Sequence, residues 1–308
     1  MSDLTHADDS RRVATIGTFA ALGGYGLWGV AVILYKMLGH ISPFEILAHR
    51  AIWSVVVMGL LILALRRADD VWRALRNPRL MGLLAFTSLL IGANWLVFIW
   101  SVAEGRIVEA SLGYYINPLI SVLLGVWLLS ERLSKAQIVS VALAATAVAI
   151  LTAGLGAFPW IALFLAVTFA IYGYLRKTMA VDALAGLGIE VLYLMPFGFV
   201  FLLWVTPEPG GAFVTATAAT KWLLIAAGPM TVVPLLLFNI GARRVRLATL
   251  GLLQYTAPTI NFLLAVFVYG EELTATHLIA FGLIWAALGI FSFDTLRTER
   301  ELRRVARV

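Results

Sequence analysis

Long apolar segments alternate with short polar connections along the whole chain. Ten of these segments have about 20 residues each, the length at which a helix crosses a hydrocarbon core of about 30 Å. They lie at 14–35, 44–65, 80–102, 107–129, 136–154, 158–175, 186–205, 220–240, 247–269 and 275–293. The spans occupy roughly two thirds of the chain. The pattern therefore predicts an all-α integral membrane protein with ten transmembrane helices, and it leaves no room for a soluble catalytic or ATP-hydrolysing domain.

The composition strengthens this prediction. Hydrophobic residues make up 61% of the 308 positions and charged residues only 13%, and the mean hydropathy is +0.93. A soluble domain carries about 25% charged residues. The chain has no cysteine, which excludes disulfides, cysteine-based metal sites and a thiol nucleophile.

The basic residues are distributed unevenly between the two sides of the predicted membrane. With the N-terminus in the cytoplasm, 19 of the 23 Lys and Arg residues fall in the tails and the cytoplasmic connections, Arg176 among them. The opposite side receives three, Lys36, Arg106 and Lys221, and Arg50 lies within a span. Short loops rich in Lys and Arg stay in the cytoplasm. The net charge of +6 is therefore interpreted as a topology signal that places both termini in the cytoplasm, and it does not indicate nucleic-acid binding.

The second half of the chain repeats part of the first. A shift of 140 residues gives 13 identities in the 45 columns of 106–150. The most informative are the proline pair, Pro118 and Pro258, and the Glu-x-Leu pair at Glu131 and Glu271, because leucine and valine matches are common in apolar chains. Chance alignment of two amphiphilic helices stays open as an alternative.

A shift of 145 residues aligns two further pairs of identical residues between the halves. Glu45 falls on Glu190, and Asn94 falls on Asn239. Five spans per half is an odd number, so two copies would lie upside down relative to each other, as in many secondary transporters. We predict one five-helix repeat over 1–155 and an inverted copy over 156–308.

Two corresponding spans carry stripes of small and polar residues at helical spacing. The stripes contain Tyr114, Asn117, Ser121 and Gly125 in the first half and Gln254, Ala257, Asn261 and Ala265 in the second. Each stripe has a neighbouring proline, Pro118 or Pro258, and a proline frees a backbone carbonyl one helical turn before it. One interpretation is a substrate path with hydrogen bonds from Tyr114, Asn117, Gln254, Tyr255 and Asn261. The other is close helix packing.

The second span contains three ionisable residues, Glu45, His49 and Arg50. A charge near the centre of a bilayer is costly, so Arg50 needs a partner, a wet cavity or a route to the interface. Glu45 and His49 are one turn apart and can meet on one helix face. The cluster could couple transport to protons, with Glu190 as its counterpart, or it could be a structural ion pair or interface anchor.

Aromatic residues complete the set of candidate site residues. Tyr25 and Trp28 share one face of the glycine-rich first span, and Tyr172 occupies the sixth span. These glycines lie inside an apolar span with no strand before them, so they do not form a dinucleotide-binding loop. The sequence also lacks a P-loop, a Gly-x-Ser-x-Gly elbow and histidines at metal-ligand spacing. We therefore expect neither an enzyme nor a cofactor.

Several segments resemble the RarD branch of the EamA transporters, which belong to the drug/metabolite transporter superfamily. The similarity covers nearly the whole chain and is most specific around Glu45 and Tyr114. It rests on segments 25–29 (YGLWG), 45–54 (EILAHRAIWS), 94–100 (NWLVFIW), 109–118 (EASLGYYINP), 172–177 (YGYLRK) and 187–190 (LGIE).

The resemblance implies a ten-helix transporter of the bacterial inner membrane, with a cavity between two inverted repeats and no ATPase. Relatives mostly export small metabolites, and the branch is linked by name to chloramphenicol. The expected partners are a small-molecule substrate and the lipid bilayer, with no nucleic acid. A homodimer stays open. The alternative functions are a scaffold or accessory subunit without transport, and an intramembrane enzyme, for which Glu271 and Glu272 are the nearest approach to a carboxylate cluster.

Overall fold

A computed structural model describes residues 2–103, 106–153, 158–206, 210–268 and 275–305. Helices account for every regular element in these ranges, and no β-strand occurs in them. The all-α prediction is thus confirmed for the described part of the chain.

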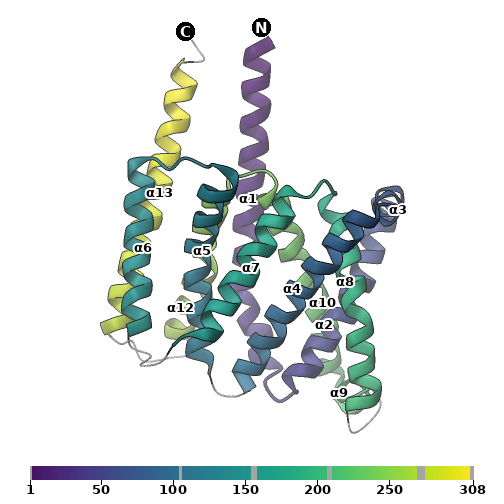
Figure 1. Cartoon of the computed structure of the whole chain (residues 1–308). Helices are drawn as coiled ribbons and strands as arrows, with labels where there is room; N and C mark the ends of the chain where they lie inside the picture. The colour runs from purple at the N-terminus through teal and green to yellow at the C-terminus, as the bar shows by residue number, and fades with distance from the viewer. Residues whose placement is uncertain (1, 104–105, 154–157, 207–209, 269–274, 306–308) are drawn as a thin grey trace.

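The long helices stand side by side as one bundle (Figure 1). They are α1 (Ser2–Met37), α2 (Pro43–Ala64), α4 (Pro78–Ala103), α5 (Ile107–Leu129), α6 (Lys135–Ala153), α7 (Trp160–Thr178), α8 (Ala183–Val200), α10 (Ala218–Ala242) and α13 (Ala275–Val305). The shorter elements are α3 (Ala68–Leu75), a π-helical turn η1 (Phe201–Val205), α9 (Ala212–Thr215), α11 (Leu247–Leu253) and α12 (Thr256–Phe267).

Local sequence explains where several helices begin and end. Pro43 occupies the first turn of α2, where its missing N–H is not needed. The side chain of Asp182 accepts hydrogen bonds from the backbone N–H groups of Leu184 and Ala185 and so caps α8. Helix α5 ends at its C-terminus with Ser130, whose φ of 53° is left-handed and therefore stops the helix.

Eight helices in the described part are long and apolar enough to cross a membrane. They correspond to the first eight predicted spans. The ninth predicted span, 247–269, corresponds to two helices, because α11 ends at Leu253 and α12 starts at Thr256. Pro258 cannot donate a hydrogen bond to the preceding turn, so a continuous helix is disfavoured there. The tenth predicted span corresponds to the shorter apolar stretch Leu278–Asp294 of α13.

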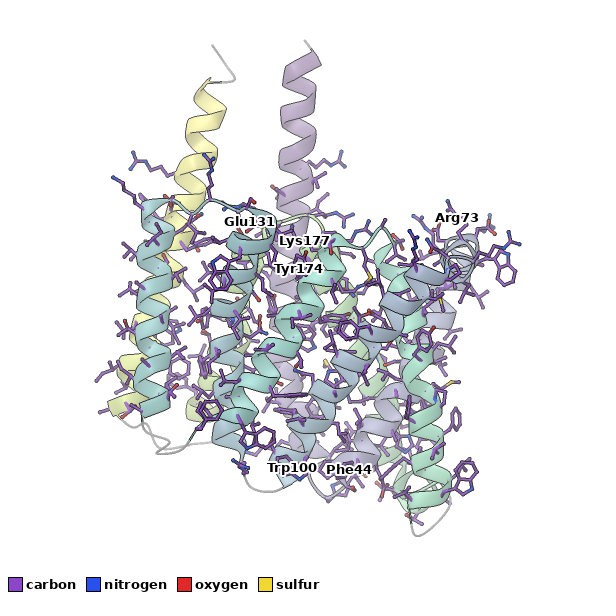
Figure 2. The ribbon with its side chains drawn as sticks, viewed as in Figure 1. Phe44, Arg73, Trp100, Glu131, Tyr174 and Lys177 are labelled. Atoms are coloured by element: carbon purple, nitrogen blue, oxygen red, sulfur yellow. The ribbon has the colours of Figure 1, made fainter. Side chains whose placement is uncertain are left out.

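The first turns of α1 and the last turns of α13 project from the same end of the bundle, which we call the tail face (Figure 1). Arg73 of α3 and Lys177 of α7 lie at this end, whereas Phe44 and Trp100 mark the opposite end, the Trp100 face (Figure 2). The short amphipathic helix α3 and the four-residue α9 were missing from the predicted spans. They lie at the tail face and the Trp100 face, respectively.

Helices from the two halves of the chain pack against each other throughout the bundle. The most extensive pairings are α5 with α7, α1 with α10, and α6 with α13. Close approach depends on glycine: a Cβ added to Gly24 of α1 would lie 2.9 Å from the carbonyl oxygen of Pro234 in α10. Gly24 and Gly29 of the first span thus act as helix contacts, whereas a Cβ added to Gly26 would have no neighbour within 4 Å.

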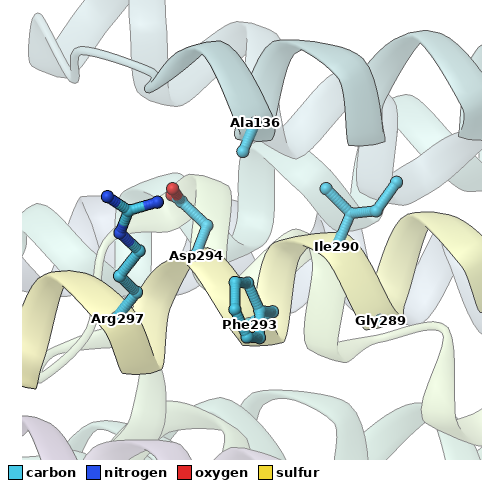
Figure 3. A pocket seen from close by; sticks show the side chains of 6 residues that line it. All are labelled: Ala136, Gly289, Ile290, Phe293, Asp294 and Arg297. Carbon is cyan, nitrogen blue, oxygen red and sulfur yellow. The ribbon is translucent and has the colours of Figure 1, made fainter.

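A pocket of about 360 Å³ lies between α6 and α13 at the edge of the bundle (Figure 3). Ala136 and residues of α13 line it, including Phe293, Asp294 and Arg297. Asp294 accepts a hydrogen bond from the hydroxyl of Ser134. The pocket contains none of the predicted site residues.

Candidate functional site

Four helices bring buried polar side chains together near the tail face. This Arg176 network consists of Thr87 of α4, Tyr172 and Arg176 of α7, Glu190 of α8 and Asn239 of α10. Glu190 accepts hydrogen bonds from the hydroxyls of Thr87 (2.5 Å) and Tyr172 (3.1 Å). The Nε atom of Arg176 donates to Oδ1 of Asn239 at 3.1 Å, and its Nη2 atom donates to the Ala183 carbonyl.

An ion pair lies at the centre of this network. Nη1 of Arg176 is 3.7 Å from Oε1 of Glu190, and the two side chains are 0% and 1% exposed. Gly186 provides the space for the guanidinium, since a Cβ at that position would overlap Nη1. Each of the two side chains has the other as its ion-pair partner inside the bundle. The network therefore joins α7 and α8 rigidly at this depth.

Aromatic rings fill the bundle next to the Arg176 network. Trp28 of α1 packs against Tyr25, Phe169 and Phe238 at ring-centroid distances of 5.6 to 5.9 Å. Tyr172 stacks on Phe238 at 6.0 Å and joins this cluster to the network. Tyr25 is buried, and its hydroxyl donates to the Leu250 carbonyl. Tyr25, Trp28 and Tyr172, predicted from separate halves, thus form one packed layer.

A second polar centre, the Arg50 site, lies toward the Trp100 face and is formed by Tyr35, Arg50, Trp95, Tyr114 and Thr231. The guanidinium of Arg50 lies 4.6 Å from the ring centre of Trp95 and 5.4 Å from that of Tyr35. Its Nε atom donates to the Thr231 hydroxyl at 2.9 Å. Tyr114 packs edge-on against Phe98 at a ring-centroid distance of 5.7 Å and keeps 38% of its surface exposed. Cation–π contacts and one hydrogen bond therefore hold this cation.

Glu45 and His49, which could have met on one face of α2, bind to other groups. Glu45 accepts a hydrogen bond from the backbone N–H of Ala212 at 2.6 Å and so caps α9. The His49 ring packs against Phe213 at 5.2 Å. No hydrogen bond or ion pair joins Glu45 to His49 in the described ranges. Glu45 therefore lies at the Trp100 face, far from its proposed counterpart Glu190.

Most of the striped and amide residues make contacts between helices. Asn94 donates to the Leu165 carbonyl and the Thr168 hydroxyl, and Asn117 donates to the Ala166 carbonyl, all in α7.

The second-half stripe follows the same pattern. Gln254 is buried, and Tyr255 donates to the Tyr115 carbonyl at 3.0 Å. Asn261 keeps a buried Oδ1 atom without a hydrogen-bond partner among the described residues. Of the five residues on these two spans proposed to hydrogen-bond substrate, only Tyr114 is more than a third exposed.

The sequence reasoning missed several residues of both centres. Arg176 was counted with a basic cytoplasmic connection because it precedes Lys177 at a helix end, but its side chain points into the bundle and is buried. Thr87 and Thr231 carried no signal, since single threonines are common in apolar helices. Trp95 lay within a recognised segment, yet its contact with Arg50 depends on the packing of α2 against α4.

Comparison with known proteins places the chain in a family. Residues 15–153 match the model of the EamA-like transporter family. An uncharacterized transporter of Vibrio cholerae is 45% identical over 94% of this chain and 95% of its own length. Protein RarD of Escherichia coli is 41% identical, covering 92% and 96% of the two chains. The chloramphenicol-sensitive protein RarD of Pseudomonas aeruginosa is 30% identical over 95% and 99%.

A solved structure confirms the fold independently. A crystal structure of a protein matches with a TM-score of 0.70 and 22% sequence identity, over 94% of this chain and 99% of the other chain. At this identity the likeness concerns the fold alone. Taken with the relatives over full length, the chain belongs to the EamA-like transporter family, in the RarD branch of the drug/metabolite transporter superfamily.

Proposed function

We propose that the protein is a secondary carrier that moves small organic solutes across the bacterial inner membrane by alternating access, most readily as an exporter. The family supplies the class, a multi-pass membrane transporter. The observation that carries the proposal is the arrangement of two polar centres at different depths, one closed and one with accessible surface. A carrier needs such an asymmetry, because it closes one side of its site while the other is open.

The packing of the helices supports the architecture of two inverted five-helix repeats, 1–155 and 156–308. In this proposal α1, α2, α4, α5 and α6 correspond in order to α7, α8, α10, the pair α11–α12, and α13. Three contacts then join equivalent helices: α2 with α8, α5 with α11, and α6 with α13. Three more occur in exchanged pairs: α1–α10 with α4–α7, α1–α12 with α5–α7, and α2–α10 with α4–α8. A twofold relation produces this pattern.

The hydrogen bond between Tyr255 and Tyr115 supports the same axis. These identical residues are 140 positions apart, the shift that aligns the halves. Equivalent residues can touch only close to a twofold axis, so α5 and the α11–α12 break would cross there. Together with α13 this reading gives ten membrane-crossing segments, the ninth of them broken. Broken helices line the substrate sites of other inverted-repeat carriers.

The two centres suggest how access alternates. The Arg176 network and the aromatic layer close the bundle toward the tail face. Arg50 is 9% exposed and Tyr114 38% exposed, so the Arg50 site retains accessible surface. In this state the site would be reached from the Trp100 face. Rocking of one repeat against the other would separate α4 from α8 at the hydrogen bond from Thr87 to Glu190 and open the tail face.

The tail face is proposed to be cytoplasmic because the basic connections gather there. The cysteine-free sequence makes a direct test simple, since one introduced cysteine is the only thiol. We expect Lys221→Cys to react with a membrane-impermeant maleimide on intact cells, and Arg73→Cys to react only after the cells are permeabilised. The reverse pattern would invert the proposed orientation.

Transport itself is tested with the purified full chain in liposomes, across amino acids, amphenicols and related solutes. We expect saturable, protein-dependent flux of at least one class without ATP. A scaffold or accessory subunit would give no flux above that of empty liposomes with any solute. Such a result, obtained with protein that is folded and correctly inserted, would refute the carrier proposal.

A further inference from the structure

We infer that the Arg50 site binds a single carboxylate group, so that the solute carried is a small organic monoanion. This inference rests on the proposed carrier function for its role in transport, but the binding site itself does not depend on it.

The first argument is the lack of a counter-ion. Arg50 lies seven residues after the start of α2, or about 10 Å along the helix, and is 9% exposed. No carboxylate lies within 4 Å of its guanidinium in the described part of the chain. Glu45, the nearest acid along α2, is occupied by the Ala212 N–H. Arg176, which is 1% exposed, has Glu190 as its counter-ion. A buried cation without an anion is costly unless a ligand supplies one.

The second argument is the set of free donors. A guanidinium has five N–H groups, and only the one on Nε has a partner, the Thr231 hydroxyl. The two terminal nitrogens make no hydrogen bond with a described residue and are not enclosed, in contrast to Nη1 of Arg176. Thr231 in turn donates to the Ala227 carbonyl at 2.7 Å, which fixes it as an acceptor for Nε. The terminal edge of Arg50 is therefore held in place and available to a ligand.

The geometry favours a carboxylate over other anions. Arg50 packs over the rings of Trp95 and Tyr35, which fixes the guanidinium plane. Two parallel N–H groups on such an edge match the two oxygens of a carboxylate. The site provides one positive charge, so it balances one negative charge, whereas a phosphate dianion would need a second cation. The surrounding rings of Trp95, Phe98 and Tyr114 suit an apolar or aromatic body on the solute.

The test uses two solutes that differ mainly in charge. Equilibrium binding of radiolabelled phenylacetate is measured on the full chain in nanodiscs, with unlabelled competitors. We expect unlabelled phenylacetate to compete. Its neutral analogue phenylacetamide should compete at least about tenfold more weakly, because it cannot form a charge-assisted hydrogen bond with Arg50. Phenyl phosphate and phenylalanine test the dianion and the zwitterion. Equal competition by phenylacetamide, or no saturable binding of phenylacetate, would overturn the inference.

Variants locate the binding to Arg50. Arg50→Gln should weaken phenylacetate binding about ten- to a hundredfold, and Arg50→Lys by less, because lysine keeps the charge and loses the paired donors. Lys221→Gln is the matched control, since it removes a positive charge near the Trp100 face away from the site. The affinity of this variant for phenylacetate should equal that of the wild type. Equal loss in Lys221→Gln and Arg50→Gln would mean unspecific attraction and would overturn the site. If Arg50→Gln does not fold, the comparison of solutes on the wild type decides.

Binding and transport can fail separately. Phenylacetate bound through Arg50 without flux of any solute would uphold the anion site and refute the carrier. Flux of neutral solutes that Arg50→Gln leaves unchanged, with no phenylacetate binding, would refute the anion site and uphold the carrier.

Discussion

Removing the guanidinium of the buried Arg176 should destabilise the protein far more than removing that of Arg246, which is partly exposed. Arg176→Gln breaks the ion pair to Glu190 and the hydrogen bonds to Asn239 and Ala183. The carboxylate of Glu190 then stays buried at 1% exposure without a cation. Breaking a buried pair in this way costs about 3–5 kcal/mol. The hydroxyls of Thr87 and Tyr172 offset only part of this.

Arg246→Gln is the matched control. Arg246 pairs with Glu131 at 3.8 Å, and its own side chain is 43% exposed while that of Glu131 is 8% exposed. Glu131 keeps hydrogen bonds from the backbone N–H groups of Leu247 and Ala248 without Arg246, so we expect this pair to contribute about 0–1 kcal/mol, as exposed pairs do. Reversible unfolding in mixed micelles, followed by circular dichroism, gives the free energy of unfolding of each variant. We expect Arg176→Gln to lose about 3 kcal/mol more than Arg246→Gln.

A double variant, Arg176→Gln with Glu190→Gln, completes the test. Because neither charge then remains unpaired, it should be more stable than the sum of the single losses predicts, by about 1–3 kcal/mol. Two results would refute the reasoning: a cost of Arg176→Gln no larger than that of Arg246→Gln, or strictly additive losses in the double variant.

Three further substitutions test individual contacts by the same unfolding measurement. Gly186→Ala places a Cβ against Nη1 of Arg176 and should cost about 1–3 kcal/mol; no loss would mean that the guanidinium has space to move. Tyr255→Phe removes the hydrogen bond to the Tyr115 carbonyl and should cost about 1 kcal/mol, with a gain in stability as the contrary result. Asn94→Ala removes two hydrogen bonds to α7 and should cost about 1–2 kcal/mol in a membrane bundle, whereas an unchanged midpoint would show that the bonds contribute nothing.

Much of the fold could be predicted because the bilayer requires continuous apolar helices of fixed length. The span predicted at 107–129 coincides with α5 (Ile107–Leu129), and the others differ mainly at their ends. The break between α11 and α12 was not predicted, since the apolar pattern continues through it. Only Pro258 hinted at the break, and Pro118 in α5 shows that a proline alone does not end a membrane helix. The short α3 and α9 lie outside the apolar pattern altogether.

The candidate site was predictable only in part, because polarity in a membrane span indicates that a residue has a partner without identifying the partner. Tyr172, Glu190 and Asn239 were singled out separately, and they meet in one network. Their common partner Arg176 looked like one more cytoplasmic cation at a helix end. Glu45 and His49 had the spacing to interact, but the short helix α9 offers Glu45 a backbone N–H that the apolar pattern could not reveal.

Counterflow in liposomes is the measurement that tests the carrier proposal most directly. Liposomes containing the full chain are loaded with unlabelled solute, and the uptake of the same labelled solute is followed without ATP or an ion gradient. The account predicts a transient accumulation of label above equilibrium, which needs a site that faces each side in turn. Simple equilibration at the same rate with and without internal solute would indicate a pore, and uptake equal to that of empty liposomes would indicate no transport. Either result would contradict a carrier that works by alternating access.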